Sequence, residues 1–150
     1  MFVRLLNNII SVLLFLHISA GAATCNDEIV LIANKTVSED CLDKRAVSHI
    51  YMAEQTKWNN GDTIMVVMQK TGTVHEDFLS RIIDISPTAL RNIWKKVIFT
   101  GMGNPPRIFK SEEDLVNFVR DTKGAIGYIG SSTSHEGVKI IKIKSDPSDS

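Results

Sequence analysis

IMVVM, residues 64–68, is an uninterrupted apolar run, and Thr73-Val74-His75-Glu76, which has the pattern of a helix start, follows it closely. Two similar runs occur elsewhere: IVLIA at residues 29–33 and AIGYI at residues 125–129. Continuous apolar runs of this length are typical of strands that are covered on both faces, as in a parallel sheet. The sequence therefore predicts three central strands.

Segments with helical spacing separate these runs. Four helix starts are predicted from their polar caps: Asp43, Thr73 with Glu76 as a capping box, Ser86 followed by Pro87, and Ser111 with Asp114. In the third helix, we expect one side to carry Leu90, Trp94, Val97 and Ile98. Residues 138–143 add an expected edge strand. Alternating strands and helices predict an α/β fold, a mostly parallel sheet flanked by helices.

Residues 1–23 have the pattern of a cleavable export signal. Arg4 supplies a positive charge, residues 9–18 are almost entirely apolar, and Ala20 and Ala22 form an A-x-A cleavage site. A membrane anchor is the weaker alternative, because this core is about half the roughly 20 apolar residues that a spanning helix needs. Lipidation of Cys25 is disfavoured, since the preceding residues lack the usual leucine. We expect one domain at residues 24–144 and a disordered tail at residues 145–150.

Two features of the exported chain bear on its chemistry. Cleavage would remove only Arg4 from the charged residues and leave 16 basic and 17 acidic side chains, which gives no electrostatic footprint for nucleic acid. Cys25 and Cys41 would both remain, and outside the cytosol such a pair predicts a disulfide rather than a metal site.

No catalytic pattern stands out. His49, His75 and His135 lie in no metal-binding or nucleophile motif, and the acidic residues 112–114 are explained by a helix first turn, where carboxylates oppose the dipole. The sequence therefore predicts neither an enzyme, nor a metal site, nor a cofactor.

The loop between residues 68 and 73 is the one candidate ligand site. The exposed N–H groups of a helix start, after the carboxyl end of a strand, favour an oxyanion. Thr71 and Thr73 add hydroxyls, Gly72 allows close approach to the backbone, and Lys70 or His75 adds charge. The alternative is that Thr73 and Glu76 form a capping box and occupy the same groups themselves.

The order of segments resembles the short phosphate-transporter solute-binding-like proteins, which correspond to one lobe of the two-lobed periplasmic binding fold. The resemblance covers residues 28–130 and is most specific at residues 86–106, S-P-x-x-L-x-x-x-W followed by I-F-x-G-x-G-x-P-P. It implies a bacterial periplasmic protein. In two-lobed relatives, a Gly-Ser-Gly-Thr-Arg run at the corresponding helix start helps to hold the anion. Here Gly72 stands at the serine position and His75 at the arginine position.

Two functions follow as hypotheses. The first is an exported solute-binding-like protein that recognises phosphate or another oxyanion at Lys70, Thr71, Gly72, Thr73 and His75, with an ABC permease as a partner. The second is an envelope protein-interaction module, because a single lobe cannot close around a ligand and would pair with a second lobe protein or with another copy of itself. We expect no membrane span after cleavage.

Overall fold

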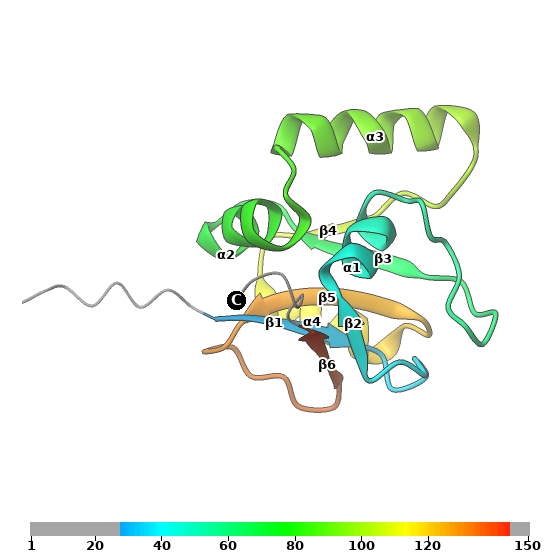
Figure 1. Ribbon diagram of the computed structural model, residues 1–150. Helices are drawn as coiled ribbons and strands as arrows, with labels where there is room; N and C mark the ends of the chain where they lie inside the picture. Colours follow the sequence, from blue (N-terminus) through cyan, green and yellow to red (C-terminus); the bar gives the residue numbers. More distant parts are fainter. Residues whose placement is uncertain (1–27, 145–150) are drawn as a thin grey trace, which may run out of the picture.

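The computed structural model describes residues 28–144 (Figure 1). Its elements, in chain order, are β1 (Ile29–Ala33), β2 (Cys41–Asp43), α1 (Lys44–Tyr51), β3 (Met65–Gln69), α2 (Thr73–Asp77), the π-helix η1 (Phe78–Ile83), α3 (Pro87–Thr100), β4 (Arg107–Phe109), α4 (Glu112–Asp121), β5 (Ala125–Gly130) and β6 (Lys139–Lys144). The export segment, Cys25 and the tail lie outside the described residues, so the statements made about them above stay predictions.

Six strands form one sheet in the order β2-β6-β1-β5-β3-β4. β3 runs parallel to β5 and to β4, and β2 runs parallel to β6, which confirms a mostly parallel sheet. β1 differs from the expectation, because it is antiparallel to β5 on one side and to β6 on the other. Its apolar run reflects the burial of Leu31, Ile32 and Ala33. Burial on both faces does not determine the direction of a strand.

The strand predicted at residues 138–143 forms as β6, but the prediction that it lies at the edge was wrong. β6 lies between β2 and β1, so both of its sides are paired. Ile141 is buried whereas its neighbour Ile140 is 46% exposed, and this alternation is typical of a strand with one covered face. The outer strands among the described residues, β2 and β4, have three residues each and are too short for an apolar pattern to reveal.

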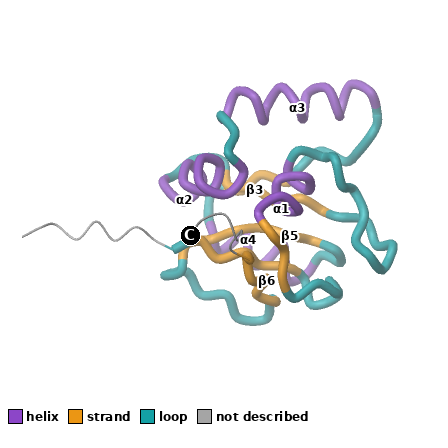
Figure 2. The backbone as a smooth tube through the Cα atoms, viewed as in Figure 1, coloured by secondary structure: helices purple, strands orange, loops and turns teal. Residues whose placement is uncertain are grey.

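Helices cover both faces of the sheet (Figures 1 and 2). Buried side chains of α1, α2, η1 and α3 share one core cluster, and those of α4 share the other. β1 supplies Leu31 and Ala33 to the first cluster and Ile32 to the second, as the alternation of side chains along a strand requires. The two clusters explain why the central strands are apolar without interruption.

Three of the four predicted helix starts are confirmed. The side chains of Asp43, Ser86 and Ser111 each accept a hydrogen bond from the backbone N–H three residues on, at 2.7, 3.2 and 3.3 Å. In α3, Leu90 and Trp94 are buried as predicted, but Ile98 is 52% exposed. The reason is that α3 packs through its earlier turns, so the last turn has little to cover it. Among the described residues, no helix is long and apolar enough to cross a membrane.

Candidate functional site

The predicted loop lies where parallel strands end together. β3, β4 and β5 run in one direction, so their carboxyl ends meet at one edge of the sheet, and Lys70 follows directly after β3. The backbone N–H of Lys70 donates to the carbonyl of Phe109, at the end of β4, over 2.7 Å. Lys70, Thr71, Gly72 and Thr73 are all exposed. This edge therefore presents the loop to solvent while β4 holds its first residue.

The predicted capping box does not form. The N-cap of α2 is Gly72, with φ 124° and ψ 163°, and no side chain caps this end. Thr73 is the first helical residue, and the N–H of Glu76 donates to the carbonyl of Gly72 over 3.0 Å. A cap at position 72 must be glycine, because that φ is unfavourable for residues with a Cβ.

The loss of the capping box leaves polar groups available. Within the described part of the chain, the hydroxyls of Thr71 and Thr73 make no hydrogen bond. α2 has only five residues, but it continues without a break into η1, so the helical backbone extends to Ile83. The alternative that Thr73 and Glu76 form a capping box is therefore wrong.

A hydrogen bond to the buried Tyr128 holds the His75 side chain. The Tyr128 hydroxyl is hydrogen-bonded to Nδ1 of His75, and it accepts the backbone N–H of Gln69 over 3.2 Å. Burial raises the pKa of Tyr128 above its usual 10.0, so the hydroxyl keeps its proton, and burial lowers the pKa of His75 below 6.5. Among the described residues, Nδ1 of His75 is the acceptor available to the Tyr128 proton, and the His75 tautomer sets which of the two groups donates. In the tautomer in which Tyr128 donates, a neutral His75 carries its proton on Nε2.

At the same edge of the sheet, Glu112 accepts hydrogen bonds from several segments. Its carboxylate accepts the Gln69 side-chain amide over 2.8 Å, the Gly130 N–H over 3.2 Å, and the Thr133 hydroxyl. These donors come from β3, from β5 and from the segment after β5. The sequence-based interpretation of Glu112 as a residue that only opposes a helix dipole was incomplete, because it also joins two strand ends to α4.

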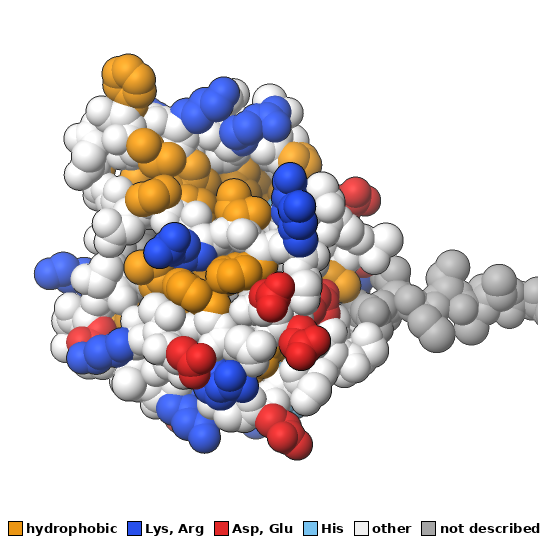
Figure 3. Space-filling view, turned by 180° about the vertical axis from the view of Figure 1, so that it is seen from behind, with side chains coloured by type: hydrophobic (Ala, Val, Ile, Leu, Met, Phe, Trp, Pro, Cys, Tyr) orange, Lys and Arg blue, Asp and Glu red, His pale blue; other side chains and the backbone are white. Residues whose placement is uncertain are grey.

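A cleft of about 380 Å³ opens beside the loop, between α3 and the β3–β4 edge. Its lining includes Lys70 and His75 from the predicted site, and also Arg91 and Lys95 from α3, which sequence reasoning missed. Figure 3 shows hydrophobic side chains in the hollow below α3, with Lys and Arg side chains around it. The sequence does show that Arg91 and Lys95 lie four residues apart on one face of a helix. It does not show that this face borders the β3–β4 edge.

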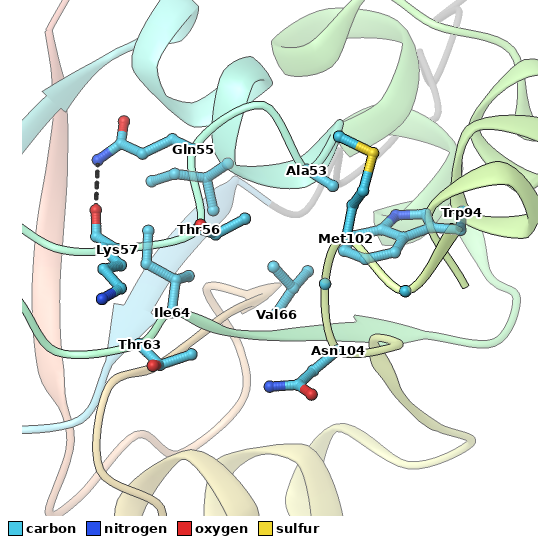
Figure 4. Close-up of a pocket in the computed structure, with 13 residues that line it drawn as sticks. Ala53, Gln55, Thr56, Lys57, Thr63, Ile64, Val66, Trp94, Met102 and Asn104 are labelled. Carbon is cyan, nitrogen blue, oxygen red and sulfur yellow. Dashed lines mark hydrogen bonds between the residues drawn. The ribbon is translucent and has the colours of Figure 1, made fainter. Parts of the chain in front are cut away.

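A second cleft, of about 240 Å³, lies away from the predicted loop (Figure 4). It is bordered by Ala53, Ile64, Trp94 and Met102, and the Gln55 side-chain amide donates to the carbonyl of Lys57 over 3.1 Å at its rim. The Trp94 indole N–H donates to the carbonyl of Tyr51 over 3.0 Å, which ties α3 to α1. Trp94 therefore has a packing role, as predicted, and this cleft holds no predicted site residue.

The remaining predicted residues are separate from this edge. Cys41 is half-buried in β2, at the far side of the sheet from β3. Its predicted disulfide partner, Cys25, is not described, so the disulfide stays a prediction. Among the described residues, no group of His, Cys, Asp or Glu side chains could hold a metal ion.

The sheet order and its two helical layers define the chain as an α/β protein. It is similar to a Vibrio cholerae ABC-type phosphate transport receptor, with a TM-score of 0.61 and 19% identity over 81% of this chain and 48% of the receptor. A Clostridium perfringens protein, described as a phosphate ABC transporter substrate-binding protein and solved with bound phosphate, gives 0.62 and 22% over 82% and 49%. PstS from Borrelia burgdorferi gives 0.62 and 14% over 79% and 48%.

The chain thus spans about half the length of these solved structures, the extent of one lobe, as the resemblance predicted. Neither a protein-family model nor a curated protein sequence matches it. At this level of identity, the similarity establishes the fold. Ligand and transport role are a separate question, which depends on the site itself.

Proposed function

We propose that this chain is an exported solute-binding-like protein that recognises phosphate, or another small oxyanion, at the loop of Lys70, Thr71, Gly72 and Thr73 with His75. The observation that carries the proposal is the open start of α2, where two threonine hydroxyls and an uncapped helix end lie exposed beside Lys70. Hydroxyls, unpaired helix N–H groups and a cation together suit an oxyanion. The similarity to a fold whose members include a phosphate-bound protein supports the same assignment.

His75 fits this site as a neutral donor. In the tautomer in which Tyr128 donates to Nδ1, the Nε2–H of His75 adds a donor without adding charge. Since Gly72 and His75 replace the serine and arginine expected by resemblance, we expect binding weaker than in a site with a full guanidinium–phosphate pair.

Isothermal titration calorimetry on protein purified after expression of the full-length chain tests the proposal, with phosphate and sulfate as ligands. We expect binding that the Thr71→Ala/Thr73→Ala double variant weakens at least about tenfold, because two hydrogen bonds to a charged ligand are lost. Ser80→Ala removes an exposed hydroxyl of η1 that is bonded to the carbonyl of Asp77, and it should leave binding unchanged. No heat of binding at millimolar phosphate and sulfate would refute the proposal.

An interaction module is the second candidate, and one observation favours it. Phe99, in the last turn of α3, is 96% exposed, and Met102, which follows the end of α3, is 75% exposed. Exposed apolar side chains that form a contiguous patch are typical of interfaces. A second copy of the chain, or a protein that supplies the missing half of the fold, would cover them. Sedimentation equilibrium checks the pairing with a second copy, since self-association that Phe99→Glu abolishes supports it and a monomer at high concentration contradicts it.

A further inference from the structure

We propose that the cleft between α3 and the β3–β4 edge binds a small amphiphilic anion, a molecule with one phosphate or carboxylate group and an apolar chain. The inference goes beyond the proposed oxyanion loop, with which the cleft shares only Lys70 and His75. Its volume of about 380 Å³ falls within the range of about 300–1,000 Å³ that is usual for small-molecule sites.

The charged side chains that line the cleft are all basic. Lys70, Arg91 and Lys95 line it, all three are exposed, and no Asp or Glu side chain lines it. None of the three forms an ion pair with a described residue; Arg91 has a 3.3 Å hydrogen bond to the neutral Thr88 hydroxyl instead. Three uncompensated cations at one rim raise the local concentration of anions and orient an anionic head group.

The Glu112 carboxylate, which is bonded to the lining residue Gln69, is engaged elsewhere. Glu112 lies behind Gln69, where it accepts hydrogen bonds from the Gln69 amide, the Gly130 N–H and the Thr133 hydroxyl. Its oxygens are therefore directed to donors of β3, β5 and the following segment, and it is not part of the lining. Gln69 separates the carboxylate from the cleft.

The floor and outer wall of the cleft are apolar. Leu79, Leu90 and Trp94 are buried at its base, whereas Ile98 and Ile108 are 52% and 57% exposed on its two sides. An inorganic anion would cover none of this surface. An apolar chain would remove Ile98 and Ile108 from water, and each methylene that it buries would raise the affinity up to about fourfold.

Binding of alkyl phosphates tests the inference. It is followed by NMR chemical shifts of the protein purified after expression of the full-length chain. We expect octyl phosphate to shift the signals of Leu90, Ile98 and Ile108, and to bind about five- to fifteenfold more tightly than hexyl phosphate. Octanoate should shift the same signals, which would show that the anionic head need not be a phosphate. Neutral 1-octanol should bind at least about threefold more weakly, because it forgoes the cationic rim.

Variants separate head-group contact from general effects of charge. Arg91→Gln/Lys95→Gln should weaken octyl phosphate about three- to tenfold and leave 1-octanol unchanged. Lys96→Gln, an exposed lysine of the same helix outside the lining, is the matched control and should change neither. Equal binding of octyl phosphate and 1-octanol, or equal effects of the double variant and the control, would overturn the inference.

A second pair of variants separates this cleft from the oxyanion loop. Ile98→Glu puts a negative charge on the wall and should abolish octyl phosphate binding, while Phe99→Glu, one residue further and outside the lining, should not. Inorganic phosphate at the loop should be unaffected by either. Loss of octyl phosphate binding in Ile98→Glu with inorganic phosphate binding intact supports the cleft and separates it from the proposed oxyanion loop. Octyl phosphate binding that survives Ile98→Glu refutes the cleft.

Discussion

The starts of α2 and α4 lie at the same edge of the sheet, after the parallel neighbours β3 and β4. They differ in capping, because side chains cap the start of α4 and none caps the start of α2. At α4, the Ser111 hydroxyl caps the helix and the Glu112 carboxylate accepts three kinds of donor from neighbouring segments. At α2, the cap is Gly72 and no side chain closes the end. One helix start is thus closed by side chains of the protein, and the other has no side-chain cap.

Glu112→Ala removes the hydrogen-bond network at the start of α4 and should have the largest effect on the free energy of unfolding. We expect the free energy of unfolding to fall by about 2–3 kcal/mol, because the Gln69 amide and the Gly130 N–H would lose a charged partner in a partly buried position. Urea unfolding followed by circular dichroism measures it. Glu113→Ala, one residue along on the exposed side, should cost less than about 0.5 kcal/mol. Equal losses for both variants would show that the network contributes nothing.

A pair of cap variants sharpens the comparison with a smaller effect. Ser111→Ala should lower the free energy of unfolding by about 1 kcal/mol, since it removes the 3.3 Å hydrogen bond to the N–H of Asp114. Thr73→Ala should change it by less than about 0.3 kcal/mol, because that hydroxyl has no partner among the described residues. The same unfolding experiment serves both. If Thr73→Ala were as costly as Ser111→Ala, the start of α2 would be capped after all.

The pH dependence of stability should show the smallest effect. Burial lowers the pKa of His75 in the folded protein below its ordinary 6.5, so the unfolded chain binds the proton more readily. The contribution of a neutral His75 is therefore complete above pH 6.5 and is lost as the pH falls from there toward the folded-state pKa.

One proton limits the slope to about 1.4 kcal/mol per pH unit. Unfolding curves between pH 8 and pH 5 should be less steeply dependent on pH for His75→Gln than for the parent chain. His49→Gln changes an exposed histidine that lies 3.5 Å from Glu54 and serves as the control. If the free energy of unfolding of His75→Gln depended on pH as steeply as that of the parent chain, another group would be responsible for the pH dependence.

Much of the fold could be predicted from local pattern, and the part that could not depends on contacts distant in sequence. The apolar runs predicted the positions of β1, β3 and β5, and the polar caps predicted three helix starts, because both patterns are local in sequence. The position of the candidate loop followed from the same signals. The direction of β1 and the inner place of β6 did not, since both are set by pairing between distant strands.

The same limit applies to the site. Glu112 has donors 43, 18 and 21 residues away, at Gln69, Gly130 and Thr133, and no spacing in the sequence relates them. The missing cap at Thr73 was also hidden, because a Thr-x-x-Glu pattern is compatible with a helix that begins one residue earlier. Arg91 and Lys95 became candidates only once α3 was placed over the β3–β4 edge.

The position of β1 also has a consequence for the order of events during synthesis. This first strand is the centre of the sheet beside β5, and Ile29 pairs with Gly130 while Leu31 pairs with Ile141. Neither partner exists until most of the chain has been made, so β1 must wait with both edges unpaired. The complete sheet can therefore form only after β5 and β6 have been made, whereas β3 and β4 can pair with each other before then.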